Sequence, residues 1–566
     1  MNAQERYRLW LESPDIDEST KEELRAIAND PQEIEERFYM ELEFGTAGLR
    51  GILGAGDNRM NVYNVRRATE GLARYLEKTV KGQARVAIAY DSRHYSDVFA
   101  KETACVLAAH GVKVYLYESL RAVPQLSFTV RELGLNAGVV ITASHNPPKY
   151  NGYKVYGASA GQSGPEEAAA ITAEIRGIEG FKTAYMNFDE AVKTGLIQLI
   201  GKEIDEIYYA KTMSLLTQPE LVREHGKDLK LVYTPLHGAG NIPVRTILSR
   251  IGIPNVYVVP EQEKPDGSFP TVTAPNPENP DAFTLAFQLA EEKGASVILA
   301  TDPDSDRLGV AVRKKDGTWQ VLTGNQIGSI LIHALLTSYQ KMGKLPANGL
   351  VVRSIVSTQL ADAICRRFGV EIHEVLTGFR FIAEEIAKAE QTGEHTFLFG
   401  FEESYGFLAG GFARDKDAIC ASMLVAQACV EYAQRGMTLA DALEEVYEIY
   451  GFYRERVKSY TLEGKAGIEK IQNAMKQLRA EPLTVIAGRK VVRVDDFTKP
   501  ELTGLPSSNV LRYTLDDETW VTVRPSGTEP KLKLYMGAHA ENETACDAIL
   551  ADVIADVDAK LSAWLA

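Results

Sequence analysis

Residues 137–157 read AGVVITASHNPPKYNGYKVYG. The run of small and apolar residues at the start of this segment predicts a buried strand that ends before Ser144. The two prolines that follow fix φ and lack an amide donor, and the pair Asn151-Gly152 predicts a tight turn. We therefore expect Ser144, with His145 beside it, in a loop of fixed shape at the edge of a sheet.

Ser144 is a candidate nucleophile because of its neighbours in the sequence. A serine hydroxyl reacts poorly unless a base or a cation assists it, and His145, Lys149 and Lys154 follow within one short segment. A Ser-His pair before prolines is also common in ordinary turns. Taken by itself, the segment therefore leaves a purely structural role open.

The length and composition of the chain indicate a multidomain globular protein. Its 566 residues correspond to about three to five domains of ordinary size. Hydrophobic residues make up 45% and charged residues 25%, and the formal net charge is −15. This acidic balance argues against a nucleic acid or an anionic membrane as the main partner, so an anionic ligand needs cations concentrated locally.

The cysteines and the N-terminus favour a cytoplasmic location. The five cysteines are scattered without C-x-x-C spacing, which argues against a disulfide framework and against a zinc site. Residues 1–20 mix charged and apolar side chains, unlike a signal peptide, and apolar stretches elsewhere are too short to cross a bilayer. We expect a cytoplasmic monomer or homodimer with no membrane or nucleic-acid partner.

The order of predicted elements divides the chain into four domains. Strands and helices alternate from about residue 64 onward, which predicts three successive mixed-sheet α/β domains over 1–207, 208–323 and 324–452. Residues 453–566 instead predict an antiparallel sheet with helices on one side, so the fourth domain is α+β. In the α/β domains, ligands are expected at the carboxyl ends of the strands.

A glycine-rich segment precedes the first domain's alternating pattern. Residues 43–60, EFGTAGLRGILGAGDNRM, contain five closely spaced glycines and predict a loop. The loop is either a flexible connector or a backbone that approaches an anionic ligand, with Arg50 directed into the same space.

Three aspartates at alternate positions form a candidate metal site. Asp302, Asp304 and Asp306 follow an apolar strand, and an extended backbone would place all three on one face. Such a cluster repels itself unless a cation neutralises it, and carboxylate oxygens favour Mg²⁺ or Ca²⁺ over zinc. The alternative is a solvated acidic turn.

Two further segments carry polar groups suited to a sugar phosphate. Residues 524–533, RPSGTEPKLK, combine a guanidinium, two hydroxyls, a glycine backbone and two amines, as a phosphate-binding loop requires. An ordinary hairpin with surface lysines is the alternative. In residues 400–406, GFEESYG, the carboxylates follow an apolar strand and suit hydrogen bonds to sugar hydroxyls.

Taken together, these motifs resemble the α-D-phosphohexomutase family. TASHNP with NGYK, DPDSDR, GFEESYG and RPSGTEP occur in that family's order and spacing across essentially the whole chain, and FGTAGLRG resembles its loop near the active site. The resemblance implies four domains around one central cleft. It also implies a phosphoserine enzyme that uses Mg²⁺ and a sugar bisphosphate as activator and intermediate.

The resemblance implies a role for each motif. By that likeness Ser144 carries the phosphoryl group, and its oxygen and the three aspartates bind the metal. The implied metal ligands are Ser144, Asp302, Asp304 and Asp306. The implied catalytic residues are Ser144, His145, Lys154 and Arg50. The implied substrate-binding residues are Arg307, Thr377, Gly378, Arg380, Glu402, Ser404, Arg524, Ser526, Gly527, Thr528 and Lys533.

The implied reaction interconverts the 1- and 6-phosphates of glucose. The chain looks most like the phosphoglucomutase and phosphopentomutase branch, so glucose 1-phosphate is the first choice, ribose or deoxyribose 1-phosphate the second and mannose the third. Arg380 stands where much of the family has lysine, and Phe401 where a glycine often opens the sugar loop. Both departures bear on the choice of sugar.

A magnesium-dependent phosphatase of the aspartate-nucleophile type is a remote alternative. Asp302-Pro-Asp304 after an apolar strand fits the start of that pattern, but Asp306 stands where it needs threonine or valine. That reading also leaves Ser144 and the loop at residues 524–533 without a role. A noncatalytic sugar-phosphate binding module would have no use for a serine beside three acidic metal ligands.

Overall fold

A computed structural model describes residues 1–45, 48–462, 464–526 and 531–565. The chain forms two compact units, each described by itself. The first unit comprises Met1–Thr323, Ala383–Phe399 and Ser404–Thr438. The second unit comprises Gly324–Ile382, Gly400–Glu403 and Leu439–Ala566.

Three short helices begin the first unit. They are α1 (Ala3–Glu12), α2 (Glu18–Ala26) and α3 (Pro31–Phe38). They pack around Trp10, whose ring meets those of Phe38 and Tyr63 edge-to-face. The Trp10 indole donates a hydrogen bond to Asp57 over 2.8 Å, so the buried ring has a polar partner and fixes the helices to the following segment.

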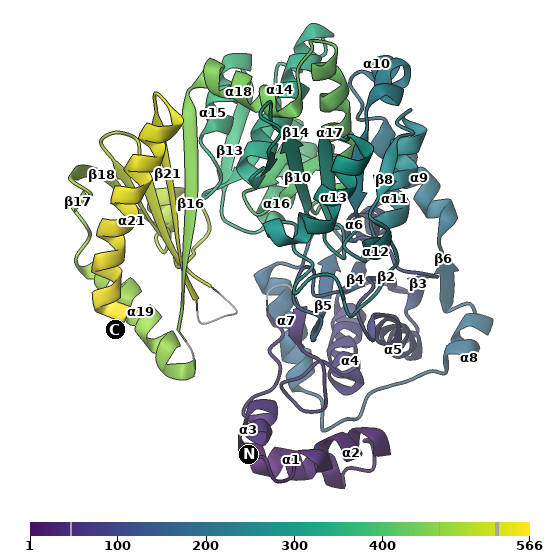
Figure 1. Ribbon diagram of the computed structural model, residues 1–566. Helices are drawn as coiled ribbons and strands as arrows, with labels where there is room; N and C mark the ends of the chain where they lie inside the picture. Colours follow the sequence, from purple (N-terminus) through teal and green to yellow (C-terminus); the bar gives the residue numbers. More distant parts are fainter. Residues whose placement is uncertain (46–47, 463, 527–530, 566) are drawn as a thin grey trace. The chain divides into compact units, whose positions relative to one another are not determined.

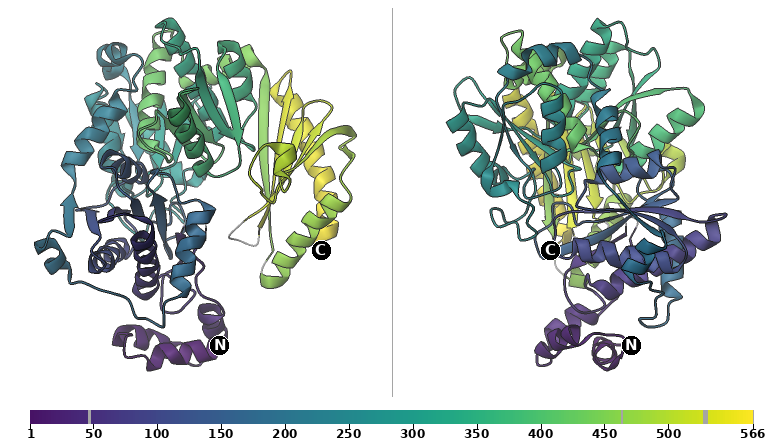
Figure 2. Two further views of the ribbon diagram at one scale, coloured as in Figure 1. Left: turned by 180° about the vertical axis from the view of Figure 1, so that it is seen from behind. Right: turned by 90° about the vertical axis from the view of Figure 1, so that its right-hand side faces the viewer.

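The first sheet has six strands in the order β1-β5-β4-β2-β3-β6, of which the last four are parallel. The strands are β1 (Gly48–Ile52), β2 (Arg85–Tyr90), β3 (Lys113–Tyr117), β4 (Ala137–Ile141), β5 (Tyr150–Gly157) and β6 (Ile197–Ile200). The helices are α4 (Val62–Thr79), α5 (Ser96–Ala109), α6 (Val123–Glu132), α7 (Pro165–Arg176) and α8 (Phe188–Lys193). Val139 of β4 lies in the core shared with α4 and α5, whereas its neighbour Gly138 faces α6. Helices therefore cover both faces (Figures 1 and 2).

The structure corrects the predicted turn at Asn151-Gly152. Both residues lie within β5, between β1 and β4, and Lys154 lies on the same strand. A Cβ at Gly152 would lie 2.4 Å from the Thr142 carbonyl oxygen, so this position needs glycine for close approach of the backbone. The Asn151 side chain donates to the His94 carbonyl and the Ser96 hydroxyl. Asn151 and Gly152 thus allow neighbouring segments to pack closely, and they do not reverse the chain.

The glycine-rich segment is only partly a loop. Gly48 and Arg50 belong to β1, which pairs antiparallel with β5 and places Gly48 opposite Lys154. A Cβ at Gly48 would lie 1.8 Å from the Tyr153 carbonyl oxygen, and φ there is 111°. These glycines allow an edge strand to pack tightly on the sheet.

The second sheet, also in the first unit, has the order β11-β10-β9-β7-β8. Its strands are β7 (Leu231–Thr234), β8 (Val256–Val258), β9 (Val297–Thr301), β10 (Leu308–Arg313) and β11 (Trp319–Val321). The accompanying helices are α9 (Lys202–Met213), α10 (Pro219–His225), η1 (Gly226–Asp228), α11 (Asn241–Arg250), α12 (Pro260–Glu263), η2 (Pro280–Phe283) and α13 (Thr284–Lys293). The acidic triplet lies in the turn that joins β9 to β10.

The third sheet has the order β13-β12-β14-β15. Its strands are β12 (Gly349–Ser354), β13 (Glu371–Val375), β14 (Thr396–Glu402) and β15 (Gly406–Ala409). The helices are α14 (Gly324–Lys341), α15 (Leu360–Phe368), α16 (Phe379–Thr392), α17 (Ala418–Ala433) and α18 (Leu439–Tyr450). The boundary between the two units passes through β14, after Phe399.

The fourth sheet, in the second unit, is antiparallel throughout and has the order β16-β21-β20-β19-β18-β17. Its strands are β16 (Phe452–Thr461), β17 (Val485–Ile486), β18 (Arg489–Asp496), β19 (Leu511–Leu515), β20 (Trp520–Pro525) and β21 (Lys531–Ala540). The helices are α19 (Gly464–Ala480), α20 (Pro500–Thr503) and α21 (Glu543–Leu565). Alternate strand residues form one core with α19 and α21, and α21 lies along the sheet in Figure 1.

These sheets confirm the predicted fold class, three mixed α/β sheets followed by a C-terminal α+β region. The four domain boundaries drawn from the sequence stay predictions. All five cysteines are free thiols and buried. Among the described residues, no helix combines the length and apolar character that crossing a bilayer requires.

Candidate active site

Ser144 lies just beyond the carboxyl end of β4, as predicted. It is buried, with 3% of its surface exposed, and its backbone takes the left-handed φ of 50°, which non-glycine residues seldom adopt. Its amide donates to the Thr142 hydroxyl oxygen over 2.8 Å. Its hydroxyl donates to Asp302 Oδ2 over 2.7 Å and lies 3.1 Å from His145 Nδ1. The loop thus holds one hydroxyl between a carboxylate and an imidazole.

The three aspartates gather through a turn and not through an extended strand. Ser305 has φ of 52°, and the amides of Asp306 and Arg307 donate to Asp302 Oδ1 over 3.1 and 2.9 Å. One oxygen from each of the three aspartates lies within 4.8 Å of the others. The predicted cluster is present, but the geometry assumed for it was wrong. The turn brings the three side chains together, whereas in an extended strand they would be spaced along one face.

The acidic cluster has the donors that a hard cation requires. Asp302, Asp304 and Asp306 are each 2% exposed or less. Asp304 Oδ1 and Asp306 Oδ1 are buried and accept no hydrogen bond from any residue the structure describes. A buried carboxylate oxygen that accepts no hydrogen bond destabilises the folded protein, and a bound cation offsets this destabilisation. Oxygen ligands of this kind fit Mg²⁺.

Two buried lysines flank the cluster. Lys154 Nζ lies 2.9 Å from Asp304 Oδ2 and 3.7 Å from Asp306 Oδ2. Lys416 Nζ lies 3.2 Å from Asp306 Oδ2 and 2.8 Å from Asp415 Oδ1. Burial and the neighbouring carboxylates raise the pKa of Asp302 well above its usual range. Burial alone would also raise the pKa of Asp306, but Lys416, Lys154 and Arg307 lower it.

His145, Arg50 and Arg307 complete this part of the site. Burial, with the positive charges of Arg307 and Arg50, lowers the pKa of His145 well below its usual value, so the imidazole is neutral near pH 7. Arg50 donates to the Asn146 side chain over 3.3 Å. Arg307 forms an ion pair with Glu278. A neutral imidazole beside a hydroxyl is able to accept its proton.

Two site residues were missed by the sequence analysis. Arg93 is buried and donates hydrogen bonds to backbone carbonyls of the Ser144 loop. Lys416 stands in the run Arg414-Asp-Lys-Asp417 just before the apolar helix α17. A signal existed for both, because Arg93 follows a strand that neighbours β4, and a charged run before an apolar helix is unusual.

The sugar-loop residues are divided between the two units. In the second unit, the Gly378 amide donates to Glu402 Oε1 over 2.7 Å, next to Thr377. The Arg380 guanidinium lies 4.5 Å from the centre of the Phe381 ring. Ser404 belongs to the first unit, between β14 and β15, and is partly exposed.

Phe401 lies in β14, at the start of the predicted sugar-binding segment 400–406. It is fully buried in the second unit, and its ring packs against Gly328 of α14, where a Cβ would lie 2.6 Å from it. Its neighbour Glu403 accepts a hydrogen bond from the Ser354 hydroxyl over 3.1 Å. Enclosure and the adjacent Glu402 carboxylate raise the pKa of Glu403 to about 7.

Two cations of the predicted phosphate loop are cross-strand neighbours. Arg524 on β20 pairs with Lys533 on β21. Leu532 and Leu534 point into the core, so Lys533 and Arg524 share the opposite face of the sheet. Like charges directly opposite each other are destabilising unless an anion joins them. The Ser526 amide donates to the Lys531 carbonyl, while Gly527 and Thr528 lie outside the described residues.

In the first unit the structure therefore brings together Ser144, His145, Lys154, Arg50, Arg307 and the three aspartates. In the second unit it joins Gly378 with Glu402, and Arg524 with Lys533.

Four domain families match the chain in order. They are described as phosphoglucomutase/phosphomannomutase α/β/α domains I, II and III and the corresponding C-terminal domain. The matched residues are 41–180, 208–317, 323–450 and 463–555.

Curated relatives resemble the chain over most of its length. A phosphoglucomutase from Staphylococcus saprophyticus is 36% identical over 545 residues, which cover 94% of this chain and 96% of the relative. A phosphoglucomutase from Staphylococcus aureus is 37% identical over 523 residues, which cover 90% of this chain and 92% of the relative.

Solved structures share the fold. A putative phosphomannomutase from Thermus thermophilus superposes with a TM-score of 0.68 at 24% identity, covering 92% of this chain and 99% of that one. The open form of the Paramecium phosphoglucomutase pp63/parafusin superposes with a TM-score of 0.71 at 17% identity, covering 93% of this chain and 96% of that one.

Proposed function

This chain belongs to the phosphoglucomutase/phosphomannomutase family, and from that membership we propose that it interconverts glucose 1-phosphate and glucose 6-phosphate through a phosphoserine at Ser144. The predicted resemblance to α-D-phosphohexomutases is confirmed. The protein is a phosphosugar mutase, an isomerase that transfers a phosphoryl group within its substrate, and the relatives named phosphoglucomutase support glucose as the sugar.

One observation carries the assignment of Ser144. Its hydroxyl, on a strained and buried loop, lies 2.7 Å from a carboxylate of the acidic cluster. Strain of this kind persists where the surrounding structure imposes it, and it is common at active sites. A structural turn would need neither the burial nor the acidic neighbours.

In the proposed reaction, phosphoserine gives its phosphoryl group to the free hydroxyl of a sugar monophosphate. The resulting bisphosphate turns around, and Ser144 takes back the other phosphoryl group. Catalysis of phosphoryl transfer depends mainly on positioning and on compensating negative charge. The residues near Ser144 supply both.

The acidic cluster would hold Mg²⁺ through Asp302, Asp304 and Asp306, with an oxygen of the Ser144 group as a further ligand. When bound, the cation neutralises charge on the transferred phosphoryl group. Lys154 holds Asp304 and adds a positive charge at the same place. Burial of the three carboxylates keeps competing water away from them.

The groups that surround Ser144 are proposed to carry out proton transfer. His145 is neutral and lies 3.1 Å from the hydroxyl, so it can hold the Ser144 proton whenever the serine is unphosphorylated. Lys154 and Arg50 are the proposed groups for proton transfer and charge compensation at the sugar hydroxyl.

The remaining predicted residues would bind the substrate. Arg307 and Ser404 of the first unit are proposed to hold the sugar, and so are Glu402, Thr377, Gly378 and Arg380 of the second unit. The cross-strand cations Arg524 and Lys533 are proposed to grip the nonreacting phosphate, together with Ser526 and the adjoining Gly527 and Thr528. A dianionic phosphate between two cations relieves their mutual repulsion.

The test is a comparison of purified wild-type protein and Ser144→Ala with Mg²⁺ and glucose 1,6-bisphosphate. We expect wild-type protein to form glucose 6-phosphate from glucose 1-phosphate, with a lower kcat/KM for mannose and ribose 1-phosphates, and Ser144→Ala to be inactive but folded. Release of inorganic phosphate without isomerisation would favour the phosphatase alternative. Near-normal turnover by Ser144→Ala would refute the nucleophile.

A further inference from the structure

A single guanidinium binds three backbone carbonyls of the Ser144 loop and one at the start of β5. Arg93 Nη2 donates to the carbonyls of Ser144 and Asn146, each over 2.5 Å. Arg93 Nη1 donates to the carbonyls of Pro147 and Tyr150, over 3.1 and 3.0 Å. The two prolines of this loop lack amide donors, and within the segment the Tyr150 amide donates to the Pro147 carbonyl. Arg93 donates to the carbonyls of Ser144 and Asn146 from outside the loop.

The loop has a conformation that needs such support. Ser144 itself has φ of 50°, and a non-glycine residue keeps such a strained angle only where the surrounding structure imposes it. Without Arg93, the carbonyls on the inner side of the loop would lose their charged donor, and the loop would relax toward ordinary backbone angles. Arg93 therefore selects the strained form that directs the Ser144 hydroxyl at Asp302.

Arg93 is itself held from two sides. Asp91 Oδ2 lies 3.4 Å from its Nε, and the same carboxylate accepts a hydrogen bond from the Thr142 hydroxyl. The other side is covered by Phe269, whose ring centre lies 5.0 Å from the guanidinium carbon. A cation over an aromatic face is attracted to it, more so when both groups are buried.

The covering ring comes from the segment that follows the second sheet's β8. Phe269 is 1% exposed and has the left-handed φ of 45°. Two residues before it, a Cβ at Gly267 would lie 2.4 Å from the His94 amide nitrogen, so the two loops meet backbone to backbone. The segment around Phe269 is thus fixed against the segment that carries Arg93.

We propose that Arg93 is a positioning residue that sets the attack geometry of Ser144, and that Phe269 holds Arg93 in place for this task. The inference rests on the proposed phosphoserine mechanism and goes beyond it. It makes the geometry of the catalytic loop depend on loops of two different sheets. Neither residue touches the reacting atoms.

The test is the Arg93→Lys variant in the full-length enzyme. An ammonium is a point donor and cannot span four carbonyls in the plane of a guanidinium. Because misplacement of a reacting group by about 1 Å costs about 100-fold in rate, we expect kcat to fall about 100-fold. KM for glucose 1-phosphate and the calorimetric affinity for Mg²⁺ should stay as in wild-type protein. Unchanged kcat would overturn the proposal, as would an equal loss in Mg²⁺ affinity.

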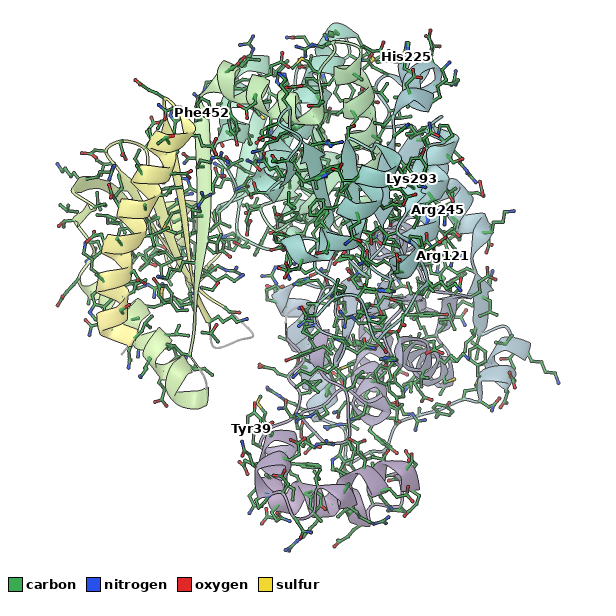
Figure 3. The ribbon with its side chains drawn as sticks, viewed as in Figure 1. Tyr39, Arg121, His225, Arg245, Lys293 and Phe452 are labelled. Atoms are coloured by element: carbon green, nitrogen blue, oxygen red, sulfur yellow. The ribbon has the colours of Figure 1, made fainter. Side chains whose placement is uncertain are left out.

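A second variant, Phe269→Leu, keeps every donor of Arg93 and removes only the ring. We expect kcat between those of wild type and Arg93→Lys, with unchanged KM; wild-type kcat would overturn the role of Phe269 even if Arg93→Lys failed to fold. The matched control is Arg121→Lys (labelled in Figure 3), whose guanidinium lies 5.2 Å from the Tyr117 ring and donates to Asp205.

Arg121→Lys should lose stability and keep wild-type kcat. A similar loss of kcat in this control would show that any arginine stacked on an aromatic ring has the effect and would overturn the proposal. If wild-type protein itself lacked mutase activity, the proposed function would fail instead, and the two failures are therefore distinguishable.

Discussion

The Lys416 side chain passes the start of β15 and reaches the acidic cluster. Its side-chain carbons pass Gly406, where a Cβ would lie 2.2 Å from Lys416 Cδ, and its ammonium bridges Asp306 and Asp415. Gly406 also pairs with Arg307, next to Asp306. Lys416 thus contacts both Gly406 and the acidic cluster, and it balances buried negative charge.

Replacing Lys416 by methionine should destabilise the protein strongly. The change leaves Asp415 and Asp306 buried with one cation fewer, and removing one partner of a buried ion pair costs about 3 kcal/mol or more. The free energy of unfolding in urea measures the loss. The control is Lys78→Met, since Lys78 pairs with Glu174 but is 65% exposed, and its loss should be within about 1 kcal/mol. Equal effects of the two variants would contradict this account.

His110 gives the stability of the first unit a dependence on pH. Its two ring nitrogens lie 2.9 Å from Glu70 and 2.6 Å from Glu77, both on α4. Burial alone would lower the pKa of His110, but the two carboxylates raise it above 6.5. Because the folded pKa is the higher one, the stabilisation is complete below pH 6.5 and is lost as pH rises through the folded value.

His110→Gln should therefore cost about 1.5 to 3 kcal/mol of unfolding free energy at low pH, the contribution of a hydrogen bond to a charged group, and less at high pH. Urea unfolding at several pH values measures the difference between variant and wild type. A cost for His110→Gln that grows with pH would contradict the predicted sign of the effect.

At the scale of elements, β5 depends on close contact with the segments on both sides of it. Gly152→Ala would place a methyl group 2.4 Å from the Thr142 carbonyl and 2.9 Å from the Leu49 carbonyl. Overpacking of this kind costs about 1 to 3 kcal/mol, and we expect a value at the upper end. Gly164→Ala, with open space around it, should change stability by about 0.5 kcal/mol or less. Thermal unfolding compares the two variants, and equal melting temperatures would refute the packing argument.

Local sequence predicted β4 and the position of Ser144 because a short run of small and apolar residues that ends at turn-forming residues favours a buried strand. It could not predict β5, because Asn-Gly favours a turn unless distant carbonyls fill the space a side chain would need. The same limit applies to Arg93 and Lys416. Their partners lie on other elements, so only the folded chain shows what they bind.

At the scale of the whole molecule, the C-terminal region has a core of its own. The buried residues of β17 and β19–β21, together with α19 and α21, form one cluster within residues 471–565. We propose that residues 453–566 are a separate domain. Expressed alone, this fragment should unfold cooperatively in urea with near-ultraviolet circular dichroism of a packed core. A fragment without a cooperative transition would contradict the boundary.

We propose that the protein works by transferring a phosphoryl group from one side chain to the substrate and accepting one back at the same side chain. The most direct measurement is mass spectrometry of peptides after incubation with Mg²⁺ and glucose 1,6-bisphosphate whose phosphoryl groups carry a heavy oxygen isotope, followed by a chase with unlabelled glucose 1-phosphate. We predict that the mass of one labelled phosphoryl group appears on Ser144 and that an unlabelled phosphoryl group replaces it during the chase at the rate of turnover. A phosphoryl group on another residue, or a label on Ser144 that the chase does not replace while turnover continues, would contradict the account.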